Sequence, residues 1–475
     1  MRADWNRRAK EDAHFYVAFG RQQQSEADFL ASAAETVPIF EREFVRLAPA
    51  AVSERRALEI GCGPGRLLLP MSRHFGEIQG VDISEEMAAL ARNRLRDVPN
   101  ARVHVTSGSD LDMLSDGHFD FVYSYAVFQH IPSREVVLSY IREAQRVLKP
   151  GGILCCQLRG APPIASELEH EPETWTGCWF SADEMAAFAR VQKFPLVAIW
   201  GTDTQYMWTT FRKATHPGVD RGISGVDVKA VTAAAGGETR VPSRGRAAAV
   251  SLWIDGFPEN GDLAHFPVLF NDRTQLGCYL SPLSASGGCQ LNARLPENIG
   301  PGNVSVQLLY DGQPIGDPHT IEVVPAPPFN PRVVSVTDGI NLTAHFRSEM
   351  GGVKVTIEEI ARPEEVSFTV RGRTVEYLQF ERKDPITSTY EFAFHLWHKT
   401  PPGTHPLVIH ISGRELEPIP LEVASSGNQR AHKTVEDERH RDQARQTGDA
   451  PLDPAVVGKR NLASTLARWF QQKKT

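Results

Sequence analysis

The chain has 475 residues and a formal net charge of −7. At roughly 100–200 residues per domain, this length predicts two to four domains. The acidic balance excludes a general electrostatic attraction to nucleic acid or to an anionic membrane surface. No apolar run reaches the roughly 20 residues that a membrane-spanning helix needs, and the polar N-terminus lacks the apolar centre of a signal peptide. We therefore expect a cytoplasmic protein without a membrane span.

The six cysteines do not indicate a metal site, because none forms a Cys-x-x-Cys pair and no histidine cluster has ligand spacing. Cys278 and Cys289 are candidates for neighbouring strands. In a reducing compartment we expect them to be buried thiols rather than a disulfide.

The first 56 residues predict a helical lead-in. Asp4–Arg21 carries aromatic side chains among charges, and Ser25 resembles the N-cap of a second helix. Apolar residues then recur on one helical face from Phe29 to Val37. Pro38 should break or kink that helix, because proline lacks the backbone N–H that helix hydrogen bonds require.

From about residue 57 to residue 213, strand-like runs alternate with helical runs, which predicts β-α-β units on a mostly parallel sheet. The expected strands are Arg56–Ile60, Glu77–Val81, Val103–Thr106, Phe119–Ser124, Ile153–Leu158, Leu196–Trp200 and Gln205–Arg212. Ser84–Asp97 and Ser133–Leu148 are the clearest helices between them. The last two strands resemble a closing antiparallel pair, so we expect seven strands in an α/β, Rossmann-like domain over residues 1–215.

Beyond a linker at 216–225, helical periodicity gives way to short alternating segments, which favours β-sandwiches. Val228–Thr232 recurs as Val333–Thr337, and Pro301-Gly302 recurs as Pro402-Gly403. The period of roughly 100 residues matches one immunoglobulin-size sandwich. We expect two all-β domains that resemble immunoglobulin-like or TIG-like sandwiches, at 226–325 and 326–424. Residues 425–475 predict a disordered tail with a C-terminal amphipathic helix.

The stretch Leu58–Gly65 carries the strongest functional signal, because glycines 61, 63 and 65 follow a short strand that contains Glu59. Glycine allows positive φ and a close approach of the backbone to a ligand. A dinucleotide loop has the pattern Gly-x-Gly-x-x-Gly. Arg66 occupies the place of its third glycine, which argues against a dinucleotide.

Leu58-Glu-Ile-Gly-Cys-Gly-Pro-Gly65 resembles the first motif of class I S-adenosylmethionine-dependent methyltransferases. Four further stretches resemble this family in the same order: Gly80–Ser84, Gly108–Leu111, Phe119–Ser124 and Leu148–Leu154. The resemblance covers roughly residues 1–213. It implies a Rossmann-like fold, S-adenosylmethionine as the cofactor and methyl transfer as the reaction.

The same resemblance implies a set of cofactor-binding residues: Glu59, Gly61, Cys62, Gly63, Gly65, Asp82, Ile83, Asp110, Leu111 and Tyr125. Glu59 would help to fix the cofactor's amino group, or would only brace the turn. Asp82 would accept the two ribose hydroxyls, which suits a carboxylate with two acceptor oxygens, or would cap the next helix. Asp110 would accept from the adenine amino group, or would be a plain turn residue.

Candidates for catalysis lie after the fourth strand. His130 has a suitable intrinsic pKa for a general base, but a role in capping the helix near Pro132 is an equal alternative. Tyr125 would line the acceptor cavity or only pack. Arg159 would hold an anionic acceptor or form a surface ion pair. Trp5 and Tyr16 of the lead-in are expected to fold over the cofactor.

The sequence therefore predicts a methyltransferase that acts on a small molecule, a sugar or a surface-polymer precursor by in-line displacement. A protein partner at the sandwiches or the C-terminal helix is a second expectation, and neither a metal nor nucleic acid is expected. Two alternatives stay open: a cofactor-fold scaffold without catalysis, and a nicotinamide-dependent oxidoreductase.

Overall fold

The computed structural model describes residues 1–18, 24–162, 174, 177–216, 223–339, 345–348, 351–375, 378–397 and 400–424. The chain divides into two compact units. The first contains Met1–Ala18 and Gln23–Pro327, and the second contains Phe19–Gln22 and Pro328–Thr475. Each unit is considered by itself below. The predicted tail at 425–475, its C-terminal helix and most of the predicted linker lie outside the described residues.

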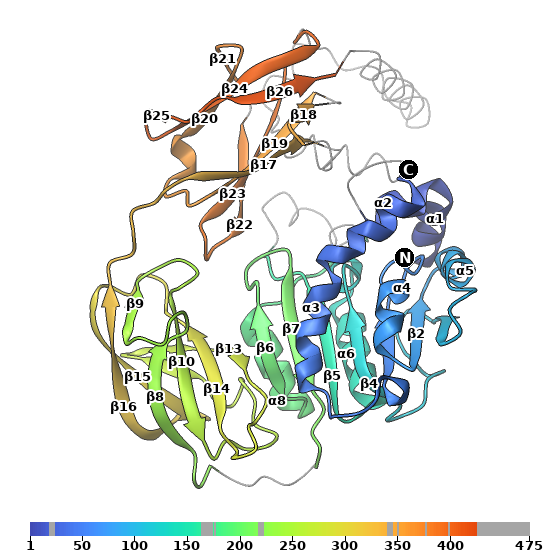
Figure 1. The fold of residues 1–475 in the computed structure, drawn as a ribbon, viewed down its shortest axis with the longest axis vertical. Coiled ribbons are helices and arrows are strands. Elements are labelled where there is room, and N and C mark those ends of the chain that lie inside the picture. Colours follow the sequence, from blue (N-terminus) through green and yellow to red (C-terminus); the bar gives the residue numbers. More distant parts are fainter. Residues whose placement is uncertain are drawn as a thin grey trace, which may run out of the picture. The chain divides into compact units, whose positions relative to one another are not determined.

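The first unit contains seven neighbouring strands in the spatial order β3–β2–β1–β4–β5–β7–β6 (Figure 1). The strands are β1 (Arg56–Ile60), β2 (Glu77–Asp82), β3 (Ala101–Val105), β4 (Phe119–Ser124), β5 (Leu148–Leu158), β6 (Leu196–Trp200) and β7 (Met207–Arg212). Strands β1 to β5 pair in parallel, whereas β7 is antiparallel to both of its neighbours. The predicted Rossmann-like α/β fold is confirmed.

The start of β5 differs from the prediction. The sequence predicts a strand over Ile153–Leu158, but β5 already begins at Leu148 and so includes the turn-forming residues Lys149-Pro-Gly-Gly152. Leu148 pairs with Phe119, and the register shifts between Phe119 and Phe121. Gly151 adopts a φ of 78°, which glycine tolerates. The turn residues are therefore part of β5, and the pairing of β5 with β4 continues beyond them.

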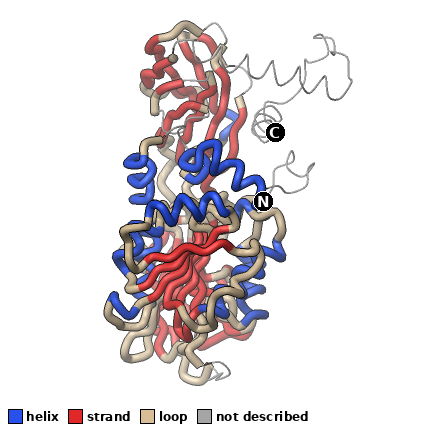
Figure 2. Tube along the Cα trace, turned by 90° about the vertical axis from the view of Figure 1, so that its right-hand side faces the viewer, coloured by secondary structure: helices blue, strands red, loops and turns tan. Residues whose placement is uncertain are grey.

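Helices lie on both sides of the strands (Figure 2). They are α4 (Leu68–Met71), α5 (Glu85–Arg94), α6 (Arg134–Val147) and α8 (Ala182–Gln192), with a short 3-10 turn η4 (Ser72–His74) after α4 and another, η5 (Phe128–His130), before α6. The hydroxyls of Ser84, Ser133 and Ser181 cap α5, α6 and α8 by accepting backbone N–H bonds. Val137, Ile141 and Ala144 of α6 are buried, as their helical spacing predicts.

The lead-in consists of short helical pieces. They are α1 (Arg2–Val17), α2 (Glu26–Ala31), η1 (Ser32–Glu35), α3 (Val37–Glu41), η2 (Arg42–Arg46) and η3 (Val52–Glu54). Pro38 lies in the first turn of α3, where its missing N–H costs little. The expected helix therefore does not end at Pro38: α2 already ends at Ala31, and α3 runs through the proline.

The rest of the first unit is β-rich. It contains β8 (Asp227–Ala233), β9 (Arg240–Pro242), β10 (Ala249–Asp255), β11 (Val268–Phe270), β12 (Arg273–Gln275), β13 (Gly277–Leu280), β14 (Cys289–Arg294), β15 (Gly302–Tyr310) and β16 (Gln313–Val324). Strands β12–β11–β15–β16–β9 form a five-stranded sheet. Strands β13–β14–β10–β8 continue the first sheet beyond β6, which makes it eleven-stranded.

The junction between the α/β part and this β-rich part is an extended set of contacts. Tyr279 of β13 pairs with Ala198 of β6, and Leu263 donates a 2.9 Å backbone hydrogen bond to the carbonyl of Leu196. Arg46 donates a 2.6 Å hydrogen bond to the carbonyl of Leu280. Residues 1–215 and 226–325 thus share a sheet and a compact unit, although the sequence predicts them as separate domains. That domain division stays a prediction.

The second unit contains two further sheets around one apolar core. The first has the order β17–β19–β23–β22, and the second has the order β18–β26–β24–β20–β21, with β25 beside β24. The strands are β17 (Arg332–Asp338), β18 (Arg347–Ser348), β19 (Gly352–Glu358), β20 (Val366–Val370), β21 (Arg373–Thr374), β22 (Gln379–Asp384), β23 (Thr389–His395), β24 (Gly403–Ile411), β25 (Arg414–Glu415) and β26 (Ile419–Val423), and a 3-10 turn η6 (Pro363–Glu365) precedes β20.

The internal repeat falls on corresponding strands of the two β-rich parts. Val228–Thr232 lies in β8 and Val333–Thr337 lies in β17. Gly302 and Gly403 each open a nine-residue strand, β15 and β24, with positive φ angles of 138° and 126°. The structure confirms the β-rich character of both parts.

Candidate functional site

The glycine-rich turn joins β1 to α4 and is braced against the end of β2. Gly61, Gly63 and Gly65 have φ angles of 73°, 52° and 84°, a region that side chains other than glycine disfavour. The amides of Gly61 and Cys62 donate to the carbonyl of Val81 at 2.8 and 3.0 Å. A Cβ at Gly61 would lie 2.3 Å from the side chain of Val127. We call the turn Gly61–Gly65 the cradle: all three backbone conformations favour glycine, and at Gly61 a side chain would also collide with Val127.

Asp82, at the carboxyl end of β2, is buried. Its two carboxylate oxygens accept backbone hydrogen bonds of 2.8 Å from Gly63 and from Ser84. Burial raises its pKa to about 6, against these stabilising bonds. Ser84, and not Asp82, caps α5. Asp82 thus links the glycine turn to the next strand end, with further lone pairs on each oxygen for hydroxyl donors.

Glu59 lies on β1 directly before the glycine turn, and only 3% of its surface is exposed. Its carboxyl accepts a 3.1 Å hydrogen bond from the hydroxyl of Tyr123 on β4. Burial raises the pKa of Glu59 to about 8. Burial also raises the pKa of the Cys62 thiol well above its usual range, which makes Cys62 an unreactive packing residue.

Asp110 lies in the turn after β3 and braces that turn. The hydroxyls of Ser107 and Ser109 donate to its carboxylate at 2.6 and 3.2 Å, and Thr106 donates to its carbonyl at 2.7 Å. The hydrogen bond from Ser107 is the main cause that lowers the pKa of Asp110. Asp110 is thus held ionised at the same edge of the sheet as Asp82.

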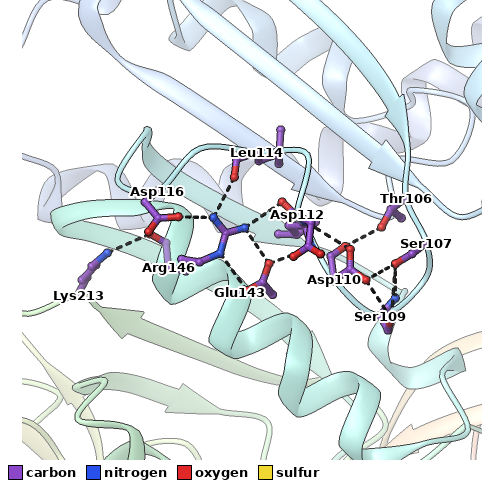
Figure 3. Close-up of polar contacts among 11 residues, drawn as sticks. Thr106, Ser107, Ser109, Asp110, Asp112, Leu114, Asp116, Glu143, Arg146 and Lys213 are labelled. Carbon is purple, nitrogen blue, oxygen red and sulfur yellow. Dashed lines mark hydrogen bonds and ion pairs between the residues drawn. The ribbon is translucent and has the colours of Figure 1, made fainter.

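A clamp from α6 holds the segment that follows Asp110 (Figure 3). Glu143 accepts a 3.0 Å hydrogen bond from the amide of Leu111. Arg146 donates to the carbonyls of Leu111 and Leu114, both at 2.9 Å, and pairs with Glu143 and Asp116. Leu111 is fully buried. The sequence analysis did not single out this clamp, although the i, i+3 spacing of Glu143 and Arg146 is visible on a predicted helix.

The segment after β4 contains a strained residue. Ala126 has a φ of 54°, and its amide donates a 3.0 Å hydrogen bond to the side chain of Gln157 on β5. Next to it, the ring of Tyr125 stacks on Trp208 with centroids 5.5 Å apart. Tyr206 also stacks on Tyr125 at 6.4 Å. Tyr125 is therefore anchored in an aromatic row beside the glycine turn.

The other two catalytic candidates, His130 and Arg159, have different surroundings. His130 ends the short turn η5, with its Nε2 3.2 Å from the Nε2 of Gln129. The ring of Trp5 from α1 lies edge-on to it at 5.7 Å. Since Ser133 caps α6, the capping alternative for His130 is wrong. Arg159 donates a 3.2 Å hydrogen bond to the carbonyl of Ala161.

Helix α1 covers the strand ends at which these residues meet. Arg2 donates to the carbonyls of Ile83 and Thr106 at 3.1 and 2.9 Å. Asn6 accepts a 2.6 Å hydrogen bond from the hydroxyl of Ser84, and Val17 lies near Gly63. The hydroxyl of Tyr16 donates to Glu11 of the same helix at 2.8 Å. Of the two lead-in aromatics expected near the site, Trp5 contacts the candidate base.

The described residues hold no cluster of three or more side chains suited to a metal ion. No helix in the described part of the chain is long and apolar enough to cross a membrane.

Part of this chain is similar in sequence to known methyltransferases. Residues 58–156 match the family model described as a methyltransferase domain. A demethylmenaquinone methyltransferase of Staphylococcus saprophyticus is 31% identical over 108 residues, which cover 22% of this chain and 44% of the relative. A ubiquinone biosynthesis O-methyltransferase of Xanthomonas campestris is 31% identical over 122 residues, which cover 26% and 50%.

Among solved structures, magnesium protoporphyrin IX methyltransferase from Synechocystis, with bound SAH, is 17% identical to this chain, with a TM-score of 0.34. The similarity covers 45% of this chain and 98% of that chain.

The match to the family model and to the two curated relatives identifies residues 58–156 as a class I, S-adenosylmethionine-dependent methyltransferase domain. The chain spans half or less of the length of these curated relatives.

Proposed function

We propose that the chain is an S-adenosylmethionine-dependent methyltransferase, of class EC 2.1.1.-. The observation that carries this proposal is the convergence of the cradle at Gly61–Gly65 with Asp82 and Asp110 at one edge of the sheet. These groups suit a ligand with an amino-acid arm and an adenosine. The matched region at 58–156 supports the same cofactor.

The cofactor supplies an electrophilic methyl group, and the residues of this chain bind and orient it. Glycines 61, 63 and 65 let the backbone approach the amino-acid arm closely, Asp82 accepts the ribose hydroxyls and Asp110 accepts from the adenine. Ile83 packs against Gly108, where a Cβ would lie 2.5 Å from its side chain, which places an apolar surface between the two acids. In-line displacement then depends mainly on proximity and alignment.

His130 is our candidate for accepting a proton from the acceptor, with Tyr125 and Arg159 as candidates for binding it. Trp5 and Gln129 both contact the His130 ring, which suits a base that must keep one orientation. The acceptor is a small molecule, a sugar or a surface-polymer precursor. The curated relatives share the cofactor-binding region with this chain, so their own acceptors do not transfer to it.

The β-rich parts are proposed to be immunoglobulin-like modules that bind a partner or position the acceptor. The strand-by-strand repeat between β8 and β17 and between β15 and β24 supports the two-module interpretation. A cytoplasmic location and a role for the C-terminal helix in partner binding remain predictions.

The test is calorimetric titration of the full-length protein with S-adenosylhomocysteine, followed by a search for acceptors with a labelled cofactor. We expect binding that Asp82→Ala weakens by about 10-fold or more, the effect of losing charged hydrogen bonds. No binding by the wild type would reject the assignment. Binding without transfer to any acceptor would favour the scaffold alternative, and NADH competing with S-adenosylhomocysteine would favour the oxidoreductase.

A further inference from the structure

Arg66 is a buried cation at the end of the glycine turn. Only 5% of its surface is exposed. Its Nη1 donates to the carbonyl and the hydroxyl of Ser32, at 3.1 and 3.3 Å. Its guanidinium lies 5.7 Å from the ring centroid of Tyr125. Within the described part of the chain, its buried Nε has no hydrogen-bond partner.

A buried guanidinium without a matching anion is costly, because the charge loses its hydration. The carboxyl that interacts with it electrostatically is Glu59. Among the described residues no ion pair joins the two side chains, and the partner of the Glu59 carboxyl is the hydroxyl of Tyr123. With a pKa raised to about 8 by burial, Glu59 is largely protonated at neutral pH. The cation of Arg66 is therefore left without an ionised partner in contact.

Both side chains flank the same turn. Glu59 precedes Gly61 by two positions and Arg66 directly follows Gly65. The three glycines between them have positive φ angles, and Gly61 lies so close to Val127 that a Cβ there would be 2.3 Å from its side chain. One buried acid and one buried base thus lie at the two ends of a cradle that the proposed function assigns to an amino-acid arm.

We propose that Arg66 binds the α-carboxylate of the cofactor's methionine arm, across the glycine turn from Glu59, which accepts its α-ammonium. The inference rests on the proposed function. An α-amino acid carries one anionic and one cationic group on adjacent atoms, which match this pair of side chains in sign. The carboxylate supplies the charged acceptor that Arg66 lacks, and the ammonium favours the ionised form of Glu59.

The test compares two ligands that differ only in the carboxylate: S-adenosylhomocysteine and its decarboxylated analogue. Each is titrated calorimetrically into the full-length protein. We expect the wild type to bind S-adenosylhomocysteine about 10- to 100-fold more tightly, the range for a hydrogen bond to a charged group. Arg66→Gln keeps a donor for Ser32 and removes the charge. We expect it to lose this preference while it retains its affinity for the decarboxylated ligand.

Arg46→Gln is the matched control. Arg46 is also a buried arginine with a buried nitrogen that lacks a partner among the described residues, but it contacts Tyr279 and Leu280 of the β-rich part. We expect this variant to keep the wild-type preference for the carboxylate, whatever stability it loses.

The outcomes separate the inference from the proposed function. A wild type that binds neither ligand rejects the proposed function, and the inference falls with it. A wild type that binds both equally, or an Arg66→Gln variant that keeps the preference, overturns the inference alone. A variant that loses both ligands to the same extent also overturns it, because Arg66 would then only shape the turn. Arg66→Met is measured in the same way if Arg66→Gln does not fold, and retention of the preference overturns the inference.

Discussion

The side-chain oxygen of Gln157 accepts a 3.0 Å hydrogen bond from the backbone amide of Ala126. Ala126 has a φ of 54°, a left-handed conformation that costs a non-glycine residue about 1–2 kcal/mol. Gln157 is fully buried on β5, and its amide nitrogen donates to the side chain of Gln129 and to the carbonyl of Gln205, both at 3.0 Å. One side chain therefore fixes the segment that holds the candidate residues Tyr125 and His130.

Gln157→Met should lower the free energy of unfolding by about 2–4 kcal/mol, because it leaves buried polar groups without partners. It should also weaken the protection of the amide of Ala126 against hydrogen exchange. Gln145→Met is the control, since its part-buried amide donates to the carbonyl of Gln192, away from the site, at 3.2 Å. Urea unfolding and amide exchange check both. Equal losses in the two variants would contradict a special role for Gln157.

Alanine substitutions at two glycines with similar φ angles should distinguish the energetic cost of backbone strain from the cost of steric crowding. Gly61 and Gly117 have φ angles of 73° and 59°, but a Cβ at Gly61 would lie 2.3 Å from Val127, whereas a Cβ at Gly117 would meet nothing within 4 Å. Gly117→Ala should cost about 1–2 kcal/mol of unfolding free energy from the backbone alone. Gly61→Ala should cost about 1–3 kcal/mol more, the typical penalty of overpacking. Urea unfolding measures the difference, and identical costs would show that Val127 moves freely.

Stability should depend on pH through Glu59 and Asp82. Their ordinary pKa values are 4.5 and 3.8, and burial raises them to about 8 and about 6 in the folded protein. Between these values the folded state binds more protons than the unfolded state. The free energy of unfolding therefore falls as pH rises, between about pH 4 and 6 for Asp82 and between about pH 4.5 and 8 for Glu59, by at most about 1.4 kcal/mol per pH unit for each group.

Glu59→Gln should remove its part of this slope. We expect the unfolding free energy of the variant to fall less steeply than that of the wild type between pH 5 and pH 8, as measured by urea unfolding without ligand. The exposed Glu54→Gln serves as the control and should keep the wild-type slope. Parallel curves for Glu59→Gln and the wild type would mean that Glu59 ionises normally in the fold.

The Arg146 clamp should matter for binding of the adenosine half. Arg146→Ala removes the donors to the carbonyls of Leu111 and Leu114, so residues 111–116 should exchange their amide protons faster. The affinity for 5′-methylthioadenosine should fall by about 10-fold, the effect of about 1.4 kcal/mol. Arg142→Ala, an exposed residue on the same helix, should change neither. Faster exchange with an unchanged affinity would show that the Arg146 clamp does not contribute to binding of the adenosine half.

The shared sheet predicts where the chain tolerates truncation. A chain that ends at Lys213 removes β13 from the edge of β6 and exposes part of the continuous apolar core. An unpaired strand edge beside an apolar surface favours aggregation. We expect this fragment to be largely insoluble, whereas a chain that ends at Pro327 should be soluble and bind S-adenosylhomocysteine like the full chain. Soluble yield and calorimetry check both, and a soluble, cooperatively folding fragment 1–213 would contradict the expectation.

Much of the first unit follows from local sequence. The predicted helix Ser84–Asp97 is present as α5, which the hydroxyl of Ser84 caps. The positive φ angles fall on Gly61, Gly63 and Gly65, as their density indicates. Asp82 ends a parallel strand next to β1, which alternating apolar runs are sufficient to predict. These features depend on residues a few positions apart, so periodicity and turn chemistry predict them.

Tertiary structure decided the features that join distant residues. Gln157 meets Ala126 across a sheet, Arg146 reaches Leu111 from the far end of α6, and Tyr279 pairs with Ala198 across the predicted linker. No local pattern marks these partners, because each contact depends on how whole strands and helices pack. The sequence by itself thus determined the cofactor class and the α/β fold. Only the packing decided which side chains brace the site, which buried charge stays uncompensated and where the sheet ends.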